Sequence, residues 1–267
     1  RYSEGSVTGL TFGFTLMLMP LMFIAQAIAT ASLPTFSEQV ALGKIPEMRT
    51  SLASALRAVL LLSIPASMGM IILRMPLIQV LYQGGKAFTS ESTQLVAWAL
   101  LWYAAGLVGH SVVEIVSRSF YALHDTRTLV IIGIVAMSIN IILSILLGKL
   151  FLMIGWMPHG GLALANSIAT GLEAVVLIVL MRSRLHGLQG SKILSAVWRS
   201  LLAASCMGTV LYLGINHWID LPSWLLLIGG GVLGVIIYGL IIAILKVDEI
   251  FQLFDIFKRK VLVRILN

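Results

Sequence analysis

Cysteine is nearly absent from this chain, since Cys206 is the only one among its 267 residues. A single cysteine excludes a disulfide within the chain and any metal site built from several cysteines. Cys206 lies in an apolar stretch, which predicts a small buried side chain rather than a reactive thiol. The sequence also lacks a phosphate-binding loop, a G-x-S-x-G motif and an H-E-x-x-H motif. We therefore expect neither an enzyme nor a nucleotide-driven pump, and no cofactor or metal.

Charge is scarce as well. Only 11% of the residues are charged and 59% are hydrophobic, whereas a typical soluble domain carries about 25% charged residues. A soluble core of this size cannot bury so much apolar surface, so lipid is the expected solvent. The net charge of +7 then indicates basic loops that orient a membrane protein rather than a nucleic-acid-binding surface.

Seven stretches are long and apolar enough to cross a membrane as helices, because a span needs about 20 mostly apolar residues. They are residues 7–31, 52–80, 95–116, 129–152, 160–181, 193–215 and 221–245. Their close spacing predicts one all-α, polytopic membrane helix bundle. Pro20 and Pro65 fall inside two spans, and each predicts a kink that is either a packing irregularity or a transporter hinge. Gly230 and Gly234 form a G-x-x-x-G spacing, which predicts close helix packing.

Lysine and arginine are unevenly distributed between alternate loops. If the loop after the first span is cytoplasmic, that side carries fourteen of these residues and the other side four. The positive-inside rule then predicts that the N-terminus is outside and the C-terminus cytoplasmic. Two segments are expected at the cytoplasmic surface: a polar linker with a short interfacial helix at 32–51, and an amphipathic basic tail at 247–267 that binds anionic lipid.

Ionisable side chains inside the predicted spans are functional candidates, because charge at membrane depth is costly. His110, Glu114 and Arg118 are spaced four apart and therefore share one helix face. This face either lines a polar cavity, where it binds a charged headgroup or relays protons, or holds a structural ion pair between Glu114 and Arg118 with His110 hydrogen-bonded nearby. A metal site on His110 and Glu114 needs further ligands and is not favoured.

Isolated polar side chains occur in other spans. Glu173 is alone in the fifth span, and we expect it to face the bundle and pair with a polar neighbour, because a carboxylate facing lipid would be desolvated. Gln26, Asn140 and Asn166 are weaker candidates, for which hydrogen bonds between helices are a sufficient explanation.

Four stretches in order carry a family resemblance: 5–34 (with GSVTGL, LMLMP and LP), 81–89 (LYQGGKAFT), 118–128 (RSFYALHDTRT) and 160–165 (GGLALA). Together they resemble the MurJ/MviN family, the lipid II flippases of bacterial peptidoglycan synthesis. The third stretch is the most specific, since it is similar to the family pattern R-A-F-Y-A-x-x-D-T-R-T-P. The chain begins with RYSE and has no initiator methionine or signal peptide, which suggests a fragment, a processed product or an incomplete gene model.

The resemblance implies a division of the chain. Residues 1–192 would form a MurJ/MATE-like C-terminal lobe with five spans, and residues 193–246 would add two helices that form a groove for a lipid tail. A further, N-terminal lobe on the same or another chain is then the expected partner, together with membrane lipids. The implied location is the bacterial cytoplasmic (inner) membrane.

The resemblance also implies a function: alternating-access transport of a lipid-linked precursor, lipid II. Thr15 stands where the family commonly carries an arginine that meets the pyrophosphate. The substrate-binding candidates are Thr15, Gln26, His110, Glu114, Arg118 and Glu173. The alternatives are one half of a related polysaccharide-lipid flippase or multidrug exporter, which shares the same fold, and a non-transporting membrane scaffold for cell-wall enzymes.

Overall fold

The computed structural model describes residues 5–82, 89–217 and 221–245, and within these ranges the chain is helical without any strand. The helices are, in order, α1 (Ser6–Pro20), the π-helix η1 (Leu21–Gln26), α2 (Ala27–Ala41), α3 (Ile45–Tyr82), α4 (Ser90–Ala122), α5 (Thr126–Met153), α6 (Pro158–Arg184), α7 (Gly190–His217) and α8 (Ser223–Ile244). α1, η1 and α2 are continuous and form one candidate membrane span, and the residues that the structure describes contain seven such spans in all. The protein is therefore an all-α, polytopic bundle, and the predicted number of spans is confirmed.

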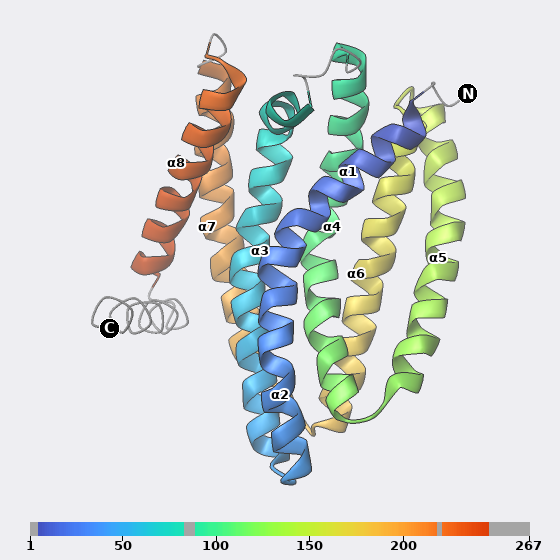
Figure 1. Cartoon of the computed structure of the whole chain (residues 1–267), viewed down its shortest axis with the longest axis vertical. Coiled ribbons are helices and arrows are strands. Elements are labelled where there is room, and N and C mark those ends of the chain that lie inside the picture. The colour runs from blue at the N-terminus through green and yellow to red at the C-terminus, as the bar shows by residue number, and fades with distance from the viewer. Residues whose placement is uncertain (1–4, 83–88, 218–220, 246–267) are drawn as a thin grey trace.

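The first span changes its helical geometry at a proline. Pro20 is the last residue of α1, and the π-helix follows directly over Leu21–Gln26. Proline has no backbone N–H and crowds the preceding turn, so a wider turn is one way to continue the helix. Figure 1 shows the result: α1 crosses the bundle obliquely, whereas α2 runs alongside α3. The irregularity predicted at Pro20 is confirmed.

The predicted interfacial linker at 32–51 is wrong as a separate element. Its first part continues α2 to Ala41, and its second part begins α3 at Ile45. The turn between them uses Gly43, whose φ of 67° suits glycine. Phe36 and Met48 are buried where the two helices pack. Hydrophobicity falls before these helices end, because a helix continues wherever its side chains still pack.

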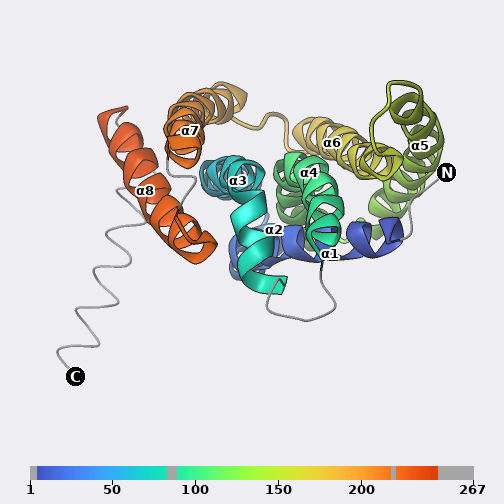
Figure 2. The ribbon, with the colours of Figure 1, turned by 90° about the horizontal axis from the view of Figure 1, so that it is seen from above.

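The helices lie in an ordered row (Figure 2). α3, α4 and α6 follow one another across the molecule, with α5 beyond α6, and with α7 and α8 beyond α3. α1 and α2 lie along one side of this row, where α1 packs mainly on α4 and α2 on α3. α4 is therefore the central helix of the lobe formed by α1–α6.

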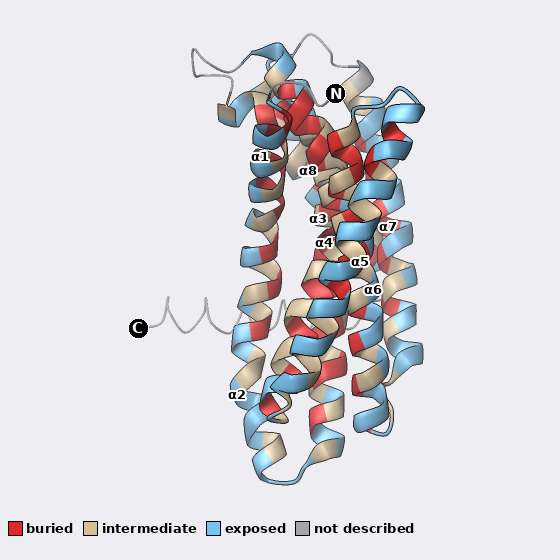
Figure 3. Ribbon diagram, turned by 90° about the vertical axis from the view of Figure 1, so that its right-hand side faces the viewer, coloured by how far each residue is buried: buried red, intermediate tan, exposed pale blue. Residues whose placement is uncertain are grey.

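The outer helices present apolar side chains to their surroundings. α5 is largely exposed along its length (Figure 3) although it is among the most apolar helices. Cys206 on α7 is also exposed, which corrects the expectation of a buried side chain. In a membrane protein an apolar neighbourhood is compatible with a surface that faces lipid, so hydrophobicity alone does not predict burial.

Candidate functional site

The central helix α4 carries the three ionisable residues singled out in the sequence. Glu114 and Arg118 form an ion pair one turn apart, with side chains 23% and 30% exposed. His110, one turn earlier, is partly buried, and its Nε2 lies 3.1 Å from Asn166 Oδ1 and 3.4 Å from Thr170 Oγ1 on α6. The contacts expected for a structural ion pair are therefore present. The pair nevertheless remains partly accessible, as a headgroup-binding face requires.

A polar stripe on α6 faces this part of α4. Asn166, Thr170 and Glu173 are spaced four and three residues apart, so they share one face of the helix. Glu173 is of intermediate exposure. Among the residues that the structure describes, Glu173 has no hydrogen bond or ion pair. The prediction that it pairs with a polar neighbour is therefore wrong. The helix period predicted the stripe, but the partner of a single carboxylate depends on how neighbouring helices are rotated.

The two candidates in the first span lie apart from these contacts. Thr15 is exposed on α1 and donates its hydroxyl hydrogen to the carbonyl of Thr11 at 2.8 Å. Gln26 is partly buried at the end of η1. The side chain of α1 that lies near His110 is instead Phe14, whose ring centroid lies 6.3 Å from that of His110 and 5.2 Å from that of Tyr103. Sequence reasoning missed Phe14 because an aromatic residue in an apolar span gives no distinguishing signal.

The two weaker asparagine candidates differ in their contacts: one bonds to another helix and the other bonds within its own helix. Asn166 joins α6 to α4 through His110, as expected for an interhelical hydrogen bond. Asn140 accepts from Ser144 one turn later on the same helix, at 3.1 Å. Within the described ranges no three His, Cys, Asp or Glu side chains are placed to hold a metal ion.

The most specific sequence motif, RSFYALHDTRT, forms the corner between α4 and α5. Asp125 Oδ1 accepts a hydrogen bond from the Thr128 backbone N–H at 3.2 Å and so caps the start of α5. Arg184, at the end of α6, pairs with Asp125 and donates to Thr128 Oγ1 at 3.1 Å. The hydrogen bonds from Thr128 and the charge of Arg184 hold the pKa of Asp125 below its ordinary value. An Asp three residues before Thr at the start of an apolar span is typical of such a cap, whereas no pattern in the sequence indicates the contact with Arg184.

Further contacts join other helix connections at the same end of the bundle. Arg49, near the start of α3, donates to the carbonyl of His186 at 3.3 Å. Gln189 donates to Thr50 Oγ1 at 3.2 Å. These bonds attach the segment between α6 and α7 to the start of α3.

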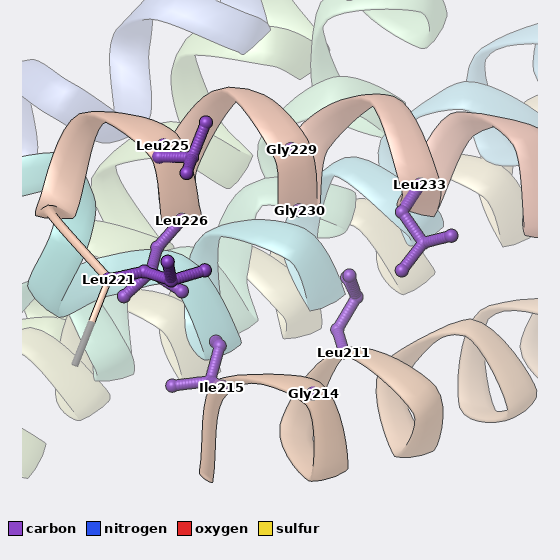
Figure 4. Close-up of a pocket in the computed structure, with 9 residues that line it drawn as sticks. All are labelled: Leu211, Gly214, Ile215, Leu221, Leu225, Leu226, Gly229, Gly230 and Leu233. Atoms are coloured by element: carbon purple, nitrogen blue, oxygen red, sulfur yellow. The ribbon is translucent and has the colours of Figure 1, made fainter. Parts of the chain in front are cut away.

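An apolar groove lies between α3, α7 and α8. One part, of about 310 Å³, is lined by Leu211, Gly214, Ile215, Leu221, Leu225, Leu226, Gly229, Gly230 and Leu233. A neighbouring part, of about 400 Å³, shares Leu211 and Gly230 with it and continues along α8 to Tyr238 and Gly239. Figure 4 shows leucine and isoleucine side chains of α7, of α8 and of the connection between them around the first part, where Gly229 and Gly230 contribute no side chain. Both volumes fall within the range of small-ligand pockets.

Polar contacts tie α8 to its neighbours at both ends of this groove. Near the α7–α8 connection, Ser223 Oγ donates to Gln79 Oε1 of α3 at 2.7 Å. At the other end, the hydroxyl of Tyr238 is hydrogen-bonded to α3 and α7. The groove is therefore apolar along its length, with hydrogen bonds between helices at both of its ends.

Comparison with known proteins gives a consistent result. A family profile described as "Lipid II flippase MurJ" matches residues 2–228. The chain is 26% identical over 219 residues to the probable lipid II flippase MurJ of Rhizobium meliloti, covering 82% of this chain and 39% of that protein. It is 30% identical over 236 residues to the corresponding probable flippase of Rickettsia prowazekii, covering 87% and 45%.

The fold is also similar to a solved structure, named "Lipid II flippase MurJ, inward closed conformation". The TM-score is 0.77 with 26% sequence identity, over 93% of this chain and 49% of that one. The chain therefore spans less than half the length of the relatives that it resembles.

Proposed function

The chain belongs to the MurJ family of lipid II flippases, and from this premise we propose that it forms one lobe of a flippase that moves lipid II across the bacterial cytoplasmic membrane. Support comes from the profile match over residues 2–228 and from the similarity in fold. Because the chain spans under half of its relatives, a second lobe on the same or another chain would complete the transport pathway. Alternating access would then arise from movement of the two lobes, without enzymatic chemistry on this chain.

The partly exposed charges on α4 are the observation that carries this proposal. Glu114 and Arg118 keep 23% and 30% of their side chains accessible at a position inside a candidate span. Ionisable groups at membrane depth usually face a protein interior or a water-filled cavity. We assign this face, together with His110 and Glu173, to the charged headgroup of the substrate. Thr15 and Gln26 would contribute from the first span.

The groove between α3, α7 and α8 would hold the apolar tail. Its lining is apolar apart from Tyr238, and glycines leave room beside α8. A lipid-linked substrate needs such a surface close to, but separate from, the site for its headgroup. The ties at Ser223 and Tyr238 would keep the groove open while the substrate moves.

The charge distribution supports an orientation. The turns after α2 and α4 and the segment after α6 meet at one end of the bundle, where Arg49 and Arg184 lie. Positive residues concentrate on the cytoplasmic side. We therefore place this end in the cytoplasm, with the C-terminus on the same side. The predicted basic tail at 247–267 lies outside the described residues.

Complementation tests the function directly. In bacteria depleted of their own flippase, we expect this chain with a partner lobe to restore growth. We expect Arg118→Ala and Glu114→Gln to abolish rescue at unchanged membrane abundance. Arg127→Ala is the matched control, since Arg127 is exposed at the start of α5. Failure of the inserted wild-type pair would contradict lipid II transport and favour another substrate, with Thr15 the first residue to test.

A further inference from the structure

One aromatic residue marks the inner end of the apolar groove. Tyr238 lines the larger part of the groove, yet it is only 8% exposed. It lies 13 residues beyond Leu225, the first lining residue within α8, which corresponds to roughly 20 Å along the helix axis. The ring therefore stands where a chain lying along α8 would have to stop or turn outward.

The hydroxyl of Tyr238 meets a backbone carbonyl that a proline has left without its helical partner. In an α-helix the carbonyl of residue 61 would accept from the N–H of residue 65. Residue 65 is proline, which has no N–H, although α3 continues through it. Tyr238 instead donates to the Leu61 carbonyl at 2.6 Å. A neighbouring helix thus supplies the hydrogen bond that Pro65 removes, as membrane helices require.

A second contact fixes the hydroxyl from the other side. Ser200 on α7 is fully buried, and its Oγ lies 2.8 Å from the Tyr238 oxygen. Because the hydroxyl hydrogen of Tyr238 points to Leu61, Ser200 is the donor in this bond. Two neighbouring helices, α3 and α7, therefore hold this side chain of α8 in place, and the loss of its hydroxyl would leave a buried carbonyl unsatisfied.

We propose that Tyr238 is a specificity-determining residue, the inner wall that limits how long an apolar chain the groove accepts. This inference rests on the proposed function of the groove as the tail site. The carbonyl freed by Pro65 and the hydroxyl of Ser200 lock the ring across the end of the groove. The ring can then act as a fixed boundary rather than a side chain that moves aside.

Competition between two prenyl chains tests the wall. The purified full chain in nanodiscs would be exposed to equal amounts of geranylgeranyl monophosphate and undecaprenyl monophosphate, and native mass spectrometry would measure the ratio in which they are bound. We expect Tyr238→Ala to raise the share of the longer chain severalfold, because its tail then gains packing contacts in the groove beyond position 238. Tyr238→Phe keeps the ring but removes both hydrogen bonds, so we expect a smaller rise.

Leu225→Ala is the matched control, because Leu225 lines only the part of the groove next to the α7–α8 connection. It should weaken the binding of both probes and leave their ratio unchanged. If folded Tyr238→Ala and the wild type bind the two probes in the same ratio, Tyr238 does not limit the length of the bound chain. Absence of binding to the wild type would instead overturn the groove as the tail site, and the inference with it.

Discussion

Gly161 in the lobe and Gly229 and Gly239 in the α7–α8 hairpin have opposite effects on the space between helices. In the lobe, Gly161 brings α6 so close to α5 that an added Cβ would lie 2.6 Å from the backbone of Leu147. On α8, a Cβ at Gly229 or Gly239 would meet nothing within 4 Å. The same residue type therefore closes one helix contact and opens a groove beside another. What differs is the element that lies opposite, which the local sequence does not specify.

Polar contacts differ in the same way between these two regions. In the lobe, His110 and Asn166 join α4 to α6 where their backbones are already close. In the hairpin, Ser223 and Tyr238 hold α8 to its neighbours on either side of open space. Hydrogen bonds thus add specificity to close packing in the lobe, whereas in the hairpin they lie at the two ends of a groove. Single substitutions in each region test this contrast.

The largest effect is expected at Gly161. Gly161→Ala places a methyl group against the α5 backbone, which cannot move aside as a flexible side chain can. Overpacking of this kind costs roughly 1–3 kcal/mol or more. Thermal unfolding of the detergent-solubilised chain would measure it. Gly171→Ala on the same helix is the control, because a Cβ there meets nothing within 4 Å; equal effects of the two substitutions would refute the close contact.

A somewhat smaller effect on stability is expected when the hydrogen bond between Tyr238 and the Leu61 carbonyl is removed. Tyr238→Phe leaves the Leu61 carbonyl buried without a partner, at a cost of about 1–3 kcal/mol. Pro65→Ala returns an N–H to that carbonyl. In the Pro65→Ala background the same Tyr238→Phe change should therefore cost clearly less, and unfolding midpoints of the four proteins would measure the coupling. Equal costs in both backgrounds would show that Tyr238 acts through packing alone.

The sequence specified the fold well, because hydrophobic length is a local property. Seven spans were predicted, and the face shared by His110, Glu114 and Arg118 follows from helix period alone. The bond between Tyr238 and Leu61 joins residues 177 positions apart. Neither Pro65 nor Tyr238 indicates the other in the sequence, although any proline inside a membrane helix leaves a carbonyl that another group must satisfy. Helix lengths and interhelical partners were therefore missed for the same reason: both depend on packing across the bundle.

A smaller effect is expected at the corner formed by Asp125, and it depends on pH. The pKa of Asp125 in the folded chain is held below its ordinary value of 3.8. Its ionised form is therefore favoured by folding, and the stabilisation is complete above that ordinary pKa. It is lost as the pH falls through 3.8 toward the lower folded pKa. At neutral pH, Asp125→Asn should cost less than about 1 kcal/mol, because the ion pair with Arg184 is partly exposed.

Asparagine is also a good helix cap, so Asp125→Asn removes the charge while retaining the cap of α5. Unfolding curves of the wild type and this variant should converge as the pH is lowered below 4, roughly the ordinary carboxyl value. Asp125→Ala serves as the comparison, since it also removes the cap and should stay less stable at every pH. A constant difference between wild type and Asp125→Asn across this range would exclude the predicted pKa shift.

The smallest effect on stability is expected at the ion pair of α4. Glu114 and Arg118 are one turn apart on a single helix and partly accessible, so their attraction adds little to helix–helix packing. Glu114→Gln keeps a hydrogen-bond acceptor for Arg118 and should change the unfolding free energy by less than about 0.5 kcal/mol. If this face contacts the headgroup, the same substitution should nevertheless abolish transport. A clear loss of stability with normal transport per molecule would instead assign the pair to the framework of the lobe, and the polar contacts of α4 would then resemble those that hold the hairpin.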